Sequence, residues 1–306
     1  MRPAAATAAL RSWLFVPGDS ERKQARALAT PADALILDLE DSVDASQRPA
    51  ARARVAALLA APAAARTAQL WVRVNAPASG LLREDLAGVC GQALPAGIVL
   101  PKVNGPQEIL QTADQLDGLE AQRHRPRGAI RLLVLATETA QGLLALPGYP
   151  AALSRSPSTL ARLSGLTWGA EDLSAALGAL GKRAADGSLT FTYQLARSTC
   201  LLAAAALQLP AIDTVYTEFR DAAGFARELD EARRDGFSGK LAIHPDQITA
   251  INAAFTPTAA ERRHAERVVA AFAAAGNAGV ASLDGQMIDR PHLLQAQRVL
   301  ARSQDP

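Results

Sequence analysis

The sequence predicts an α/β fold, a (β/α)8 TIM barrel with a C-terminal helical extension. The chain has 306 residues, and its first 250 or so hold eight short apolar runs that alternate with Ala/Leu/Arg/Glu-rich helical stretches. Most of these runs are continuously apolar, as is typical of parallel strands buried on both faces beneath helices. Eight strand–helix units in about 250 residues match the size of a barrel.

The predicted strands cover residues 12–17, 34–40, 70–75, 97–103, 130–138, 163–169, 212–217 and 239–245. A doubly wound open sheet is the structural alternative. No GxGxxG motif follows the first strand, and GALGK at 178–182 lacks the spacing of a Walker lysine motif. The closed barrel is therefore favoured.

The barrel domain is assigned to residues 1–255, and the helical extension to residues 256–306. Thr258 and Glu261 have capping-box spacing, and they open a stretch with apolar residues at i, i+3, i+4 and i+7. A Gly-containing turn is predicted at 280–289, followed by a last amphipathic helix. This extension is expected to act as a lid that completes a neighbouring subunit's site.

Composition excludes several classes of function. The net charge is only +2 with acids and bases spread along the chain, so neither a nucleic-acid partner nor a polybasic membrane patch is indicated. The densest basic stretch, 123–128, is predicted to be a solvated loop. The start of the chain, MRPAAATAAL, lacks the apolar core of a signal peptide, and no apolar run is long enough for a membrane span. Cys90 and Cys200 form no CxxC motif, which fits a reducing, cytoplasmic setting.

Barrel active sites lie at the carboxyl ends of the strands, where the strand–helix loops meet. The polar residues at these predicted ends are Gly18, Asp19, Asp38, Glu40, Asp41, Arg73, Asn75, Lys102, Glu138, Glu171, Asp172, Glu218 and His244. Carboxylates dominate, and so many acids need a cation among them. An all-oxygen set suits Mg²⁺, or alternatively Mn²⁺. Glu138 and Asp172 follow neighbouring strands and are the predicted ligands, although either alone could be a helix cap or a surface acid.

At these residues the chain resembles the citrate lyase β-subunit family, part of a wider group of Mg²⁺-dependent aldolases that includes malyl-CoA and citramalyl-CoA lyases and the HpcH/HpaI-type aldolases. The matching stretches are RSWLFVPGDSERK, ADALILDLEDSV, VRVNA, VLPKV, TETAQG, WGAEDLSAALG, AIDTVYTEFRD, GFSGKLAIHPDQI and DGQMIDRP, in order along nearly the whole chain. The HpcH/HpaI-type aldolases carry a His near the end of strand 2, where this chain has Asp41. That difference favours the acyl-CoA branch.

The resemblance implies a barrel enzyme, often a homotrimer, that acts on CoA thioesters of short hydroxy-dicarboxylic acids. It assigns Mg²⁺ to Glu138 and Asp172 and substrate binding to Arg73. It makes Asp289 an acid/base that closes over a neighbouring subunit's site. A late aspartate in a Gly-containing turn would otherwise be interpreted as a turn residue.

The expected reaction is reversible cleavage of a short 3-hydroxyacyl-CoA, such as citramalyl-CoA, malyl-CoA or citryl-CoA, into acetyl-CoA and a 2-oxo acid. Arg73, Asp289 and Asp38 are the predicted catalytic residues, and Glu138 and Lys102 are expected to contact substrate. The three acids of ALILDLEDS are expected to fix metal-bound waters and basic groups such as Arg73 or Lys102. Without Mg²⁺ this acidic cluster is expected to be a local liability.

For the CoA phosphates the candidates are Gly18, Arg22 and Lys23, although a solvated helix end would have the same sequence. Lys102 could instead be the Schiff-base lysine of a metal-free aldolase, and His244 is expected to be a structural hydrogen-bonding residue.

Three functional alternatives stay open. The same scaffold could hydrolyse the thioester of malyl-CoA or citramalyl-CoA. It could also be the β subunit of a citrate lyase complex that acts on acyl-carrier thioesters, or a non-catalytic small-molecule-binding barrel.

Overall fold

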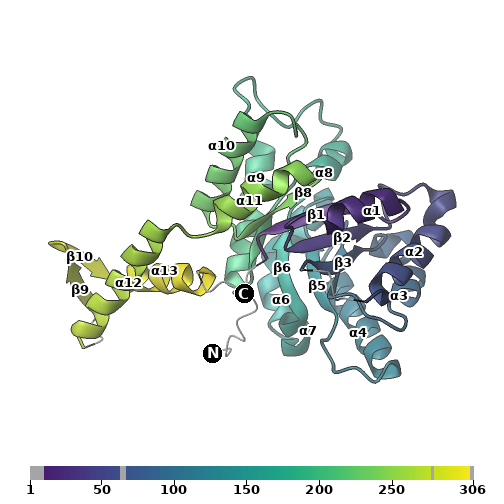
Figure 1. Ribbon diagram of the computed structural model, residues 1–306, viewed down its shortest axis with the longest axis horizontal. Coiled ribbons are helices and arrows are strands. Elements are labelled where there is room, and N and C mark those ends of the chain that lie inside the picture. The colour runs from purple at the N-terminus through teal and green to yellow at the C-terminus, as the bar shows by residue number, and fades with distance from the viewer. Residues whose placement is uncertain (1–9, 63–66, 277–278, 304–306) are drawn as a thin grey trace.

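Eight parallel strands form a closed barrel in the computed structural model, which describes residues 10–62, 67–276 and 279–303. Each strand pairs with the next and β8 pairs with β1, so the predicted TIM barrel is confirmed (Figure 1). The strands are β1 (Ser12–Pro17), β2 (Ala34–Asp38), β3 (Gln69–Arg73), β4 (Gly97–Leu100), β5 (Arg131–Leu135), β6 (Leu163–Thr167), β7 (Ala211–Asp213) and β8 (Gly239–Ala242).

Several strands end earlier than predicted. β4 ends at Leu100 and β5 at Leu135, so Lys102 and Glu138 lie in the loops that follow. Lys102 has a φ of 51°, the left-handed region that a non-glycine residue seldom adopts. This backbone turn places Lys102 outside the regular hydrogen-bond ladder of the strands.

Side chains alternate across the barrel wall with the period of two that strands impose. The inward-facing set forms a small apolar core inside the barrel, made of Trp13, Ala34, Ile36, Trp71, Val99, Leu133, Leu135, Ile212 and Leu241. The outward-facing residues join a much larger core beneath the helices. Because Ile36 and Trp71 point inward, Asp38 and Arg73, two residues further along, also point inward at the mouth.

The helices around the barrel are α1 (Glu21–Leu28), α2 (Arg48–Ala60), α3 (Leu82–Val89), α4 (Pro106–Gln122), α5 (Ala140–Ala145), α6 (Tyr149–Leu153), α7 (Pro157–Arg162), α8 (Ala170–Leu177), α9 (Phe191–Ala206), α10 (Ala222–Asp235) and α11 (Ile248–Phe255). Side chains cap several of their N-termini. Ser20 accepts from the N–H of Lys23 in α1, and Asp221 accepts from the N–H of Gly224 in α10.

A buried charge network holds β6, β7 and β8 together behind the barrel wall. Asp213 accepts hydrogen bonds from Trp168 Nε1 (2.7 Å) and from Lys240 Nζ (2.9 Å), and Lys240 is fully buried. Glu228 provides the second carboxylate for Lys240, at 2.7 Å. Because Trp168 lies in the short loop between β6 and α8, this network fixes one edge of the barrel mouth.

The C-terminal extension has a small hydrophobic core of its own. It comprises α12 (Ala259–Ala274), β9 (Val280–Leu283), β10 (Gln286–Asp289) and α13 (Arg290–Arg302), and it projects away from the barrel (Figure 1). The predicted capping box is confirmed, since Thr258 and Glu261 bond each other's backbone N–H groups. The prediction of a simple turn at 280–289 was wrong. The segment is an antiparallel hairpin, turned by Asp284 and Gly285, both at positive φ.

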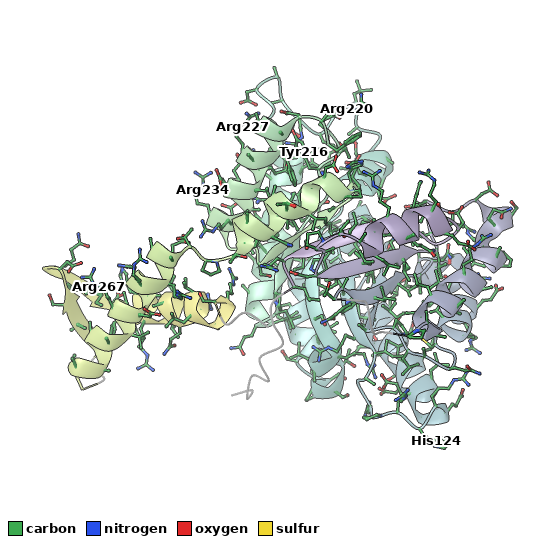
Figure 2. The ribbon with its side chains drawn as sticks, in the orientation of Figure 1. His124, Tyr216, Arg220, Arg227, Arg234 and Arg267 are labelled. Carbon is green, nitrogen blue, oxygen red and sulfur yellow. The ribbon has the colours of Figure 1, made fainter. Side chains whose placement is uncertain are left out.

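The remaining predictions concern the basic loop, the two cysteines and membrane spans. The basic segment 123–128 is an exposed loop, and His124 lies at the opposite end of the barrel from Tyr216 and Arg220 (Figure 2). Cys90 and Cys200 are both free and buried. Among the residues that the structure describes, no helix is long and apolar enough to cross a membrane. The expectation that MRPAAATAAL is not a signal peptide concerns residues 1–9, which lie outside the described ranges.

Candidate active site

A cavity of about 630 Å³ opens at the carboxyl ends of the barrel strands. It is lined by six of the predicted site residues: Arg22, Lys23, Asp38, Arg73, Glu138 and Asp172. Lys102 does not line the cavity but contacts its acids, and Gly18 and Asp289 are also absent from the lining. The structure therefore brings most of the predicted residues to one place.

Arg73 and Asp38 form a two-pronged ion pair at the centre of the mouth. They are register partners on β3 and β2, and Arg73 Nε and Nη2 donate to the two Asp38 oxygens at 2.6 and 2.7 Å. The Phe15 ring lies 4.8 Å from the guanidinium carbon and supports it from β1. This geometry fixes the orientation of the arginine before any substrate arrives.

The surroundings of Asp38 favour its ionised form. Burial by itself would raise its pKa, but the Arg73 charge and hydrogen bonds, together with the N–H groups of Ser42 and Glu40, lower the pKa below its ordinary value. Each carboxylate oxygen accepts one bond from Arg73 and one from the backbone. The arrangement suits Asp38 for holding Arg73 in position.

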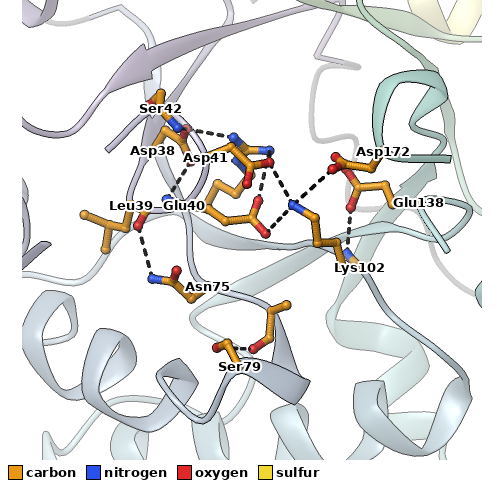
Figure 3. A network of polar contacts seen from close by, with 12 residues as sticks. Asp38, Leu39, Glu40, Asp41, Ser42, Asn75, Ser79, Lys102, Glu138 and Asp172 are labelled. Carbon is orange, nitrogen blue, oxygen red and sulfur yellow. Dashed lines mark hydrogen bonds and ion pairs between the residues drawn. The ribbon is translucent and has the colours of Figure 1, made fainter. Parts of the chain in front are cut away.

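Lys102 places its ammonium among the remaining acids of the mouth. Its Nζ lies 2.7 Å from both Glu40 and Asp41 and 3.4 Å from Asp172 (Figure 3). Burial lowers the pKa of Lys102, but Asp41, Glu40 and Glu138 outweigh that effect and hold it above the usual value. A lysine that stays protonated is a poor nucleophile, so the arrangement does not favour the Schiff-base alternative.

Glu40 is buried, and only one of its two carboxylate oxygens is hydrogen-bonded. Its Oε2 is buried and lies 3.0 Å from Arg73 Nη1 without the alignment of a hydrogen bond. Burial raises the pKa of Glu40 to about 7, despite the opposing charges of Arg73 and Lys102.

Glu138 and Asp172 meet because the loops after β5 and β6 are neighbours (Figure 3). Glu138 Oε2 accepts the backbone N–H of Lys102 at 2.6 Å, and Asp172 lies in the first turn of α8. A Cβ atom on Gly169 would stand 2.6 Å from Glu138 Cγ, so the carboxylate occupies space that only glycine leaves free. Thr137 Oγ1 accepts the N–H of Gly169 at 3.1 Å and links the two loops.

The site lacks positive charge at Glu138. Burial raises its pKa well above the ordinary value, and the charges of Asp172 and Glu40 add to the effect, while Arg73 opposes it. A divalent cation would offset the excess of negative charge around Glu138. Within the described ranges no three Asp, Glu, His or Cys side chains converge as a ready metal site. Two carboxylates fit Mg²⁺, which commonly takes one or two and leaves its other positions to water and substrate.

The phosphate candidates lie on α1, on the other side of the cavity. Arg22 and Lys23 line it together with Arg26, one helical turn further on. The N–H of Gly18 donates to the carbonyl of Asp38 at 2.8 Å, and this close approach leaves no room for a Cβ atom on Gly18. The basic side chains of α1 are therefore the groups that face the cavity.

Asp289 lies in the extension, at the end of β10 and at the N-cap of α13. Its carboxylate Oδ1 is 2.6 Å from His292 Nδ1, and both side chains are about half exposed. The sequence placed Asp289 in a turn, and the structure gives it this capping position instead.

Sequence reasoning missed several lining residues. Phe15 could have been found, because it lies two residues after the inward-facing Trp13 on the same strand. Arg26 could have been found from its helical spacing to Arg22 and Lys23. Thr214 could have been found in the same way, because it lies two residues after the inward-facing Ile212 in the predicted strand 212–217, whereas this alternation does not indicate Val215.

Three comparisons place the chain among known proteins. A family model described as HpcH/HpaI aldolase/citrate lyase matches residues 11–245. The mitochondrial citramalyl-CoA lyase of Rattus norvegicus is 35% identical over 294 residues, with 95% of this chain and 85% of that protein covered. The (3S)-malyl-CoA thioesterase of Cereibacter sphaeroides is 33% identical over 296 residues, covering 96% of this chain and 94% of its own length.

A solved structure shares both sequence and fold with the chain. It is the protein CitE from Mycobacterium tuberculosis, crystallised in complex with magnesium, acetoacetate and coenzyme A. The TM-score is 0.73 and the identity 33%, with 97% of this chain and 99% of that chain covered.

Proposed function

Because the chain belongs to the HpcH/HpaI aldolase/citrate lyase family, we propose that it is a Mg²⁺-dependent carbon–carbon lyase that reversibly cleaves a short 3-hydroxyacyl-CoA. The products would be acetyl-CoA and a 2-oxo acid, from a substrate such as citramalyl-CoA, malyl-CoA or citryl-CoA. The observation that carries the proposal is the meeting of Glu138, Asp172 and Arg73 in one cavity with a basic opposite wall. The relative named citramalyl-CoA lyase supports the reaction type.

Cleavage breaks the bond between the hydroxyl-bearing carbon and the carbon next to the thioester. A base takes the hydroxyl proton, the hydroxyl oxygen becomes the carbonyl oxygen of the oxo acid, and the enolate of acetyl-CoA takes up a proton on carbon. Held by Glu138 and Asp172, Mg²⁺ would supply Lewis-acid stabilisation to the oxygens of the oxo-acid half. CitE was crystallised with magnesium, which supports this choice of metal.

Arg73 contributes oriented hydrogen-bond donors. Two of its N–H groups bond Asp38, so the guanidinium is held in place while its remaining donors can meet oxygens that gain charge. Asp38 acts through Arg73. The ammonium of Lys102 balances the negative charges of Glu40 and Asp41 and lies 3.4 Å from the Asp172 carboxylate. These contacts favour a role for Lys102 at the edge of the substrate site.

Asp289 would deliver the proton to the enolate carbon from a neighbouring copy. Its extension projects away from its own barrel, and this supports action between subunits of a homo-oligomer, for which we propose a trimer (Figure 1). Phe191, Leu195 and Leu202 form an exposed apolar stripe on α9 that supports association of copies. The barrel domain and the extension, divided near residue 255, would then belong to two different sites.

We propose a cytoplasmic setting for the enzyme, because both cysteines are free and buried and make no disulfide.

A thioesterase is the second candidate, because one relative is named (3S)-malyl-CoA thioesterase. Hydrolysis releases the free CoA thiol, whereas the lyase releases an oxo acid and leaves the thioester bond of acetyl-CoA intact. The β subunit of a citrate lyase complex is a third candidate, and it would act on acyl-carrier thioesters in place of CoA esters.

One assay separates these activities. Citramalyl-CoA, malyl-CoA and citryl-CoA, and the same acyl groups as acyl-carrier thioesters, are each supplied with and without EDTA, and oxo acid and free thiol are measured in parallel. We expect oxo acid without free thiol, and loss of activity on chelation. Free thiol alone would establish the thioesterase, and activity only with acyl-carrier thioesters would establish the complex subunit.

The metal site is tested in the same assay. Asp172→Asn should abolish activity and weaken Mg²⁺ binding measured by calorimetry. Glu171→Gln removes the neighbouring carboxylate of α8, which pairs with Lys182, and should have a much smaller effect. If activity survives full chelation and borohydride traps a covalent adduct, the reaction would use Lys102 as a Schiff-base lysine and would need no metal.

A further inference from the structure

Three apolar side chains form part of the cavity floor. Phe15, Leu135 and Leu241 line the cavity and belong to the inward-facing layer of β1, β5 and β8. Thr214 lines the same cavity and follows β7 directly. It points into the barrel because it lies two residues after the inward-facing Ile212. The hydroxyl of Thr214 therefore stands among apolar groups.

The Thr214 hydroxyl has no hydrogen-bond partner among the residues that the structure describes, although Thr214 is only 5% exposed. A buried hydroxyl without a partner costs free energy. Other hydroxyls at the mouth are satisfied, since Thr137 Oγ1 accepts the N–H of Gly169 at 3.1 Å and Thr139 Oγ1 that of Gly142 at 2.9 Å. The Thr214 hydroxyl, in contrast, is available to a ligand in the cavity.

A second hydroxyl of this kind lies deeper in the barrel, on the neighbouring strand. Thr167 Oγ1 on β6 is buried and has no hydrogen-bond partner within the described ranges. The register partners of Thr167, Leu135 and Ile212, both face the barrel interior, so Thr167 faces it too. Thr167 is absent from the lining of the cavity. The two threonines thus differ in that Thr214 faces the cavity and Thr167 lies beneath it.

The position of Thr214 around the mouth indicates which part of the substrate it meets. The predicted metal ligands Glu138 and Asp172 follow β5 and β6, and the basic side chains of α1 follow β1. β7 lies between these two regions, because the barrel order is β5-β6-β7-β8-β1, and Arg73 on β3 lies on the opposite wall. With the oxo-acid half at the metal and the CoA phosphates on the basic side, the thioester group would lie between them, beside Thr214.

We propose that Thr214 is a further catalytic residue, whose hydroxyl donates a hydrogen bond to the thioester oxygen as that oxygen gains negative charge. The inference rests on the proposed function, which supplies the thioester. In cleavage, the electron pair of the broken carbon–carbon bond moves into the acetyl-CoA enolate, and the negative charge comes to lie on this oxygen. Thr214 keeps its own proton and stabilises the charge, as donors do when they are placed where charge develops.

The test removes the hydroxyl and keeps the shape of the side chain. Thr214→Val should lower kcat about a hundredfold and leave KM unchanged, because the hydrogen bond strengthens only as charge develops. Thr214→Ser keeps a hydroxyl and should restore most of the activity. Thr167→Val removes the deeper hydroxyl and should change neither kcat nor KM. Exchange of the acetyl-CoA methyl hydrogens with deuterium oxide reports enolate formation alone, and in Thr214→Val it should slow by the same factor as kcat.

Thermal unfolding separates this role from a structural one. Because neither hydroxyl has a partner in the described part of the chain, Thr214→Val and Thr167→Val should both melt at the wild-type temperature or above it. Wild-type kcat in Thr214→Val would overturn the inference, and so would a raised KM with kcat unchanged. A loss of activity accompanied by a lower melting temperature in Thr214→Val would also overturn it.

The same measurements distinguish this inference from the proposed reaction. If the wild type cleaves the substrate and Thr214→Val cleaves it equally fast, the inference fails and the lyase stands. If the wild type releases free thiol in place of oxo acid, the lyase fails. The loss in Thr214→Val should then remain, because hydrolysis also places negative charge on the thioester oxygen. A wild type that turns over no thioester would overturn both.

Discussion

At the level of single residues, Lys102 explains how the mouth tolerates so many acids. Its ammonium lies 2.7 Å from Glu40 and from Asp41, while Arg73 neutralises Asp38. The three acids of ALILDLEDS therefore lie beside Arg73 and Lys102, the two basic residues that the sequence analysis named as their neighbours. The deficit of positive charge lies at Glu138, one loop further round the barrel.

Glu40 should make the metal-free protein less stable as pH rises. In the folded chain its pKa is about 7, against 4.5 for an ordinary glutamate, so between these values the folded state holds a proton that the unfolded state has released. The free energy of unfolding should therefore fall between about pH 4.5 and 7 and level off above, by at most about 3 kcal/mol from this group.

The measurement is urea unfolding at pH 5 and pH 8 in EDTA. Glu40→Gln, which resembles the protonated side chain, should show a smaller decrease in the free energy of unfolding than the wild type. Glu231→Gln removes the same charge from an exposed position on α10 and should keep the wild-type decrease. An unchanged decrease in Glu40→Gln would show that this carboxyl does not hold its proton in the folded state.

At the level of elements, the junction between β6 and α8 places the predicted metal ligands. Gly169 has a φ of −122°, which any residue adopts, so its importance lies in the space beside Glu138. Thr137 ties this junction to the loop after β5 through the N–H of Gly169. The two carboxylates thus depend on backbone positions that contact no metal themselves.

Gly169→Ala should weaken Mg²⁺ binding about tenfold or more, because the new Cβ atom would displace Glu138. Calorimetric titration with Mg²⁺ measures the affinity, and circular dichroism checks that the fold is retained. Gly181→Ala, in the loop after α8 where a Cβ atom meets nothing within 4 Å, is the matched control. Wild-type affinity in Gly169→Ala would mean that Glu138 does not hold the metal.

The strands were predictable because buried parallel strands leave long apolar runs, and the capping box at Thr258 was predictable because it is local. The hairpin of β9 and β10 was missed although Asp284 and Gly285 form a typical hairpin turn. Its strands are short and partly exposed, so their pattern is weak.

The site was partly predictable for a geometric reason. Strand ends converge in a barrel, so Glu138, Asp172, Asp38 and Arg73 could be grouped from strand order. Which groups pair could not be read from the chain, because the position of Lys102 depends on a left-handed backbone turn after β4. The contact between Phe219 and His244 likewise joins two loops whose conformations are not encoded by a short pattern.

At the level of the whole molecule, the extension packs around its own core and joins the barrel beside α10, where Arg233 pairs with Glu261. Asp289 lies in this extension and is absent from the lining of its own cavity. This organisation favours a closed ring of copies in which the extension of each copy reaches the cavity of a neighbour. Cyclic symmetry would then give every cavity an Asp289 from another copy.

Mixing two inactive variants tests that exchange. Arg73→Gln and Asp289→Asn should each be nearly inactive alone. Their mixed oligomers should recover about a quarter of wild-type activity, because in a random equal mixture a quarter of sites pair an intact cavity with an intact neighbouring Asp289. Light scattering gives the number of subunits.

The double variant supplies the control for that experiment. Asp289→Asn mixed with the Arg73→Gln/Asp289→Asn chain contains no Asp289, so it should stay inactive. If the mixture of the single variants is no more active than the mean of its components, Asp289 either acts in the active site of its own barrel or takes no part in the reaction.

The closure of the ring by β1 and β8 also bears on how the chain is made. Ser12 pairs with Lys240 and Leu14 with Ala242, so the first strand of the barrel finds one of its two neighbours only after almost the whole barrel has been synthesised. Until then the apolar faces of β1 and one open edge stay uncovered, and such segments associate wrongly when they are crowded. Nascent chains of this protein should therefore depend on chaperones up to the emergence of β8, and ribosomal pauses before that point should favour aggregation more than pauses after it.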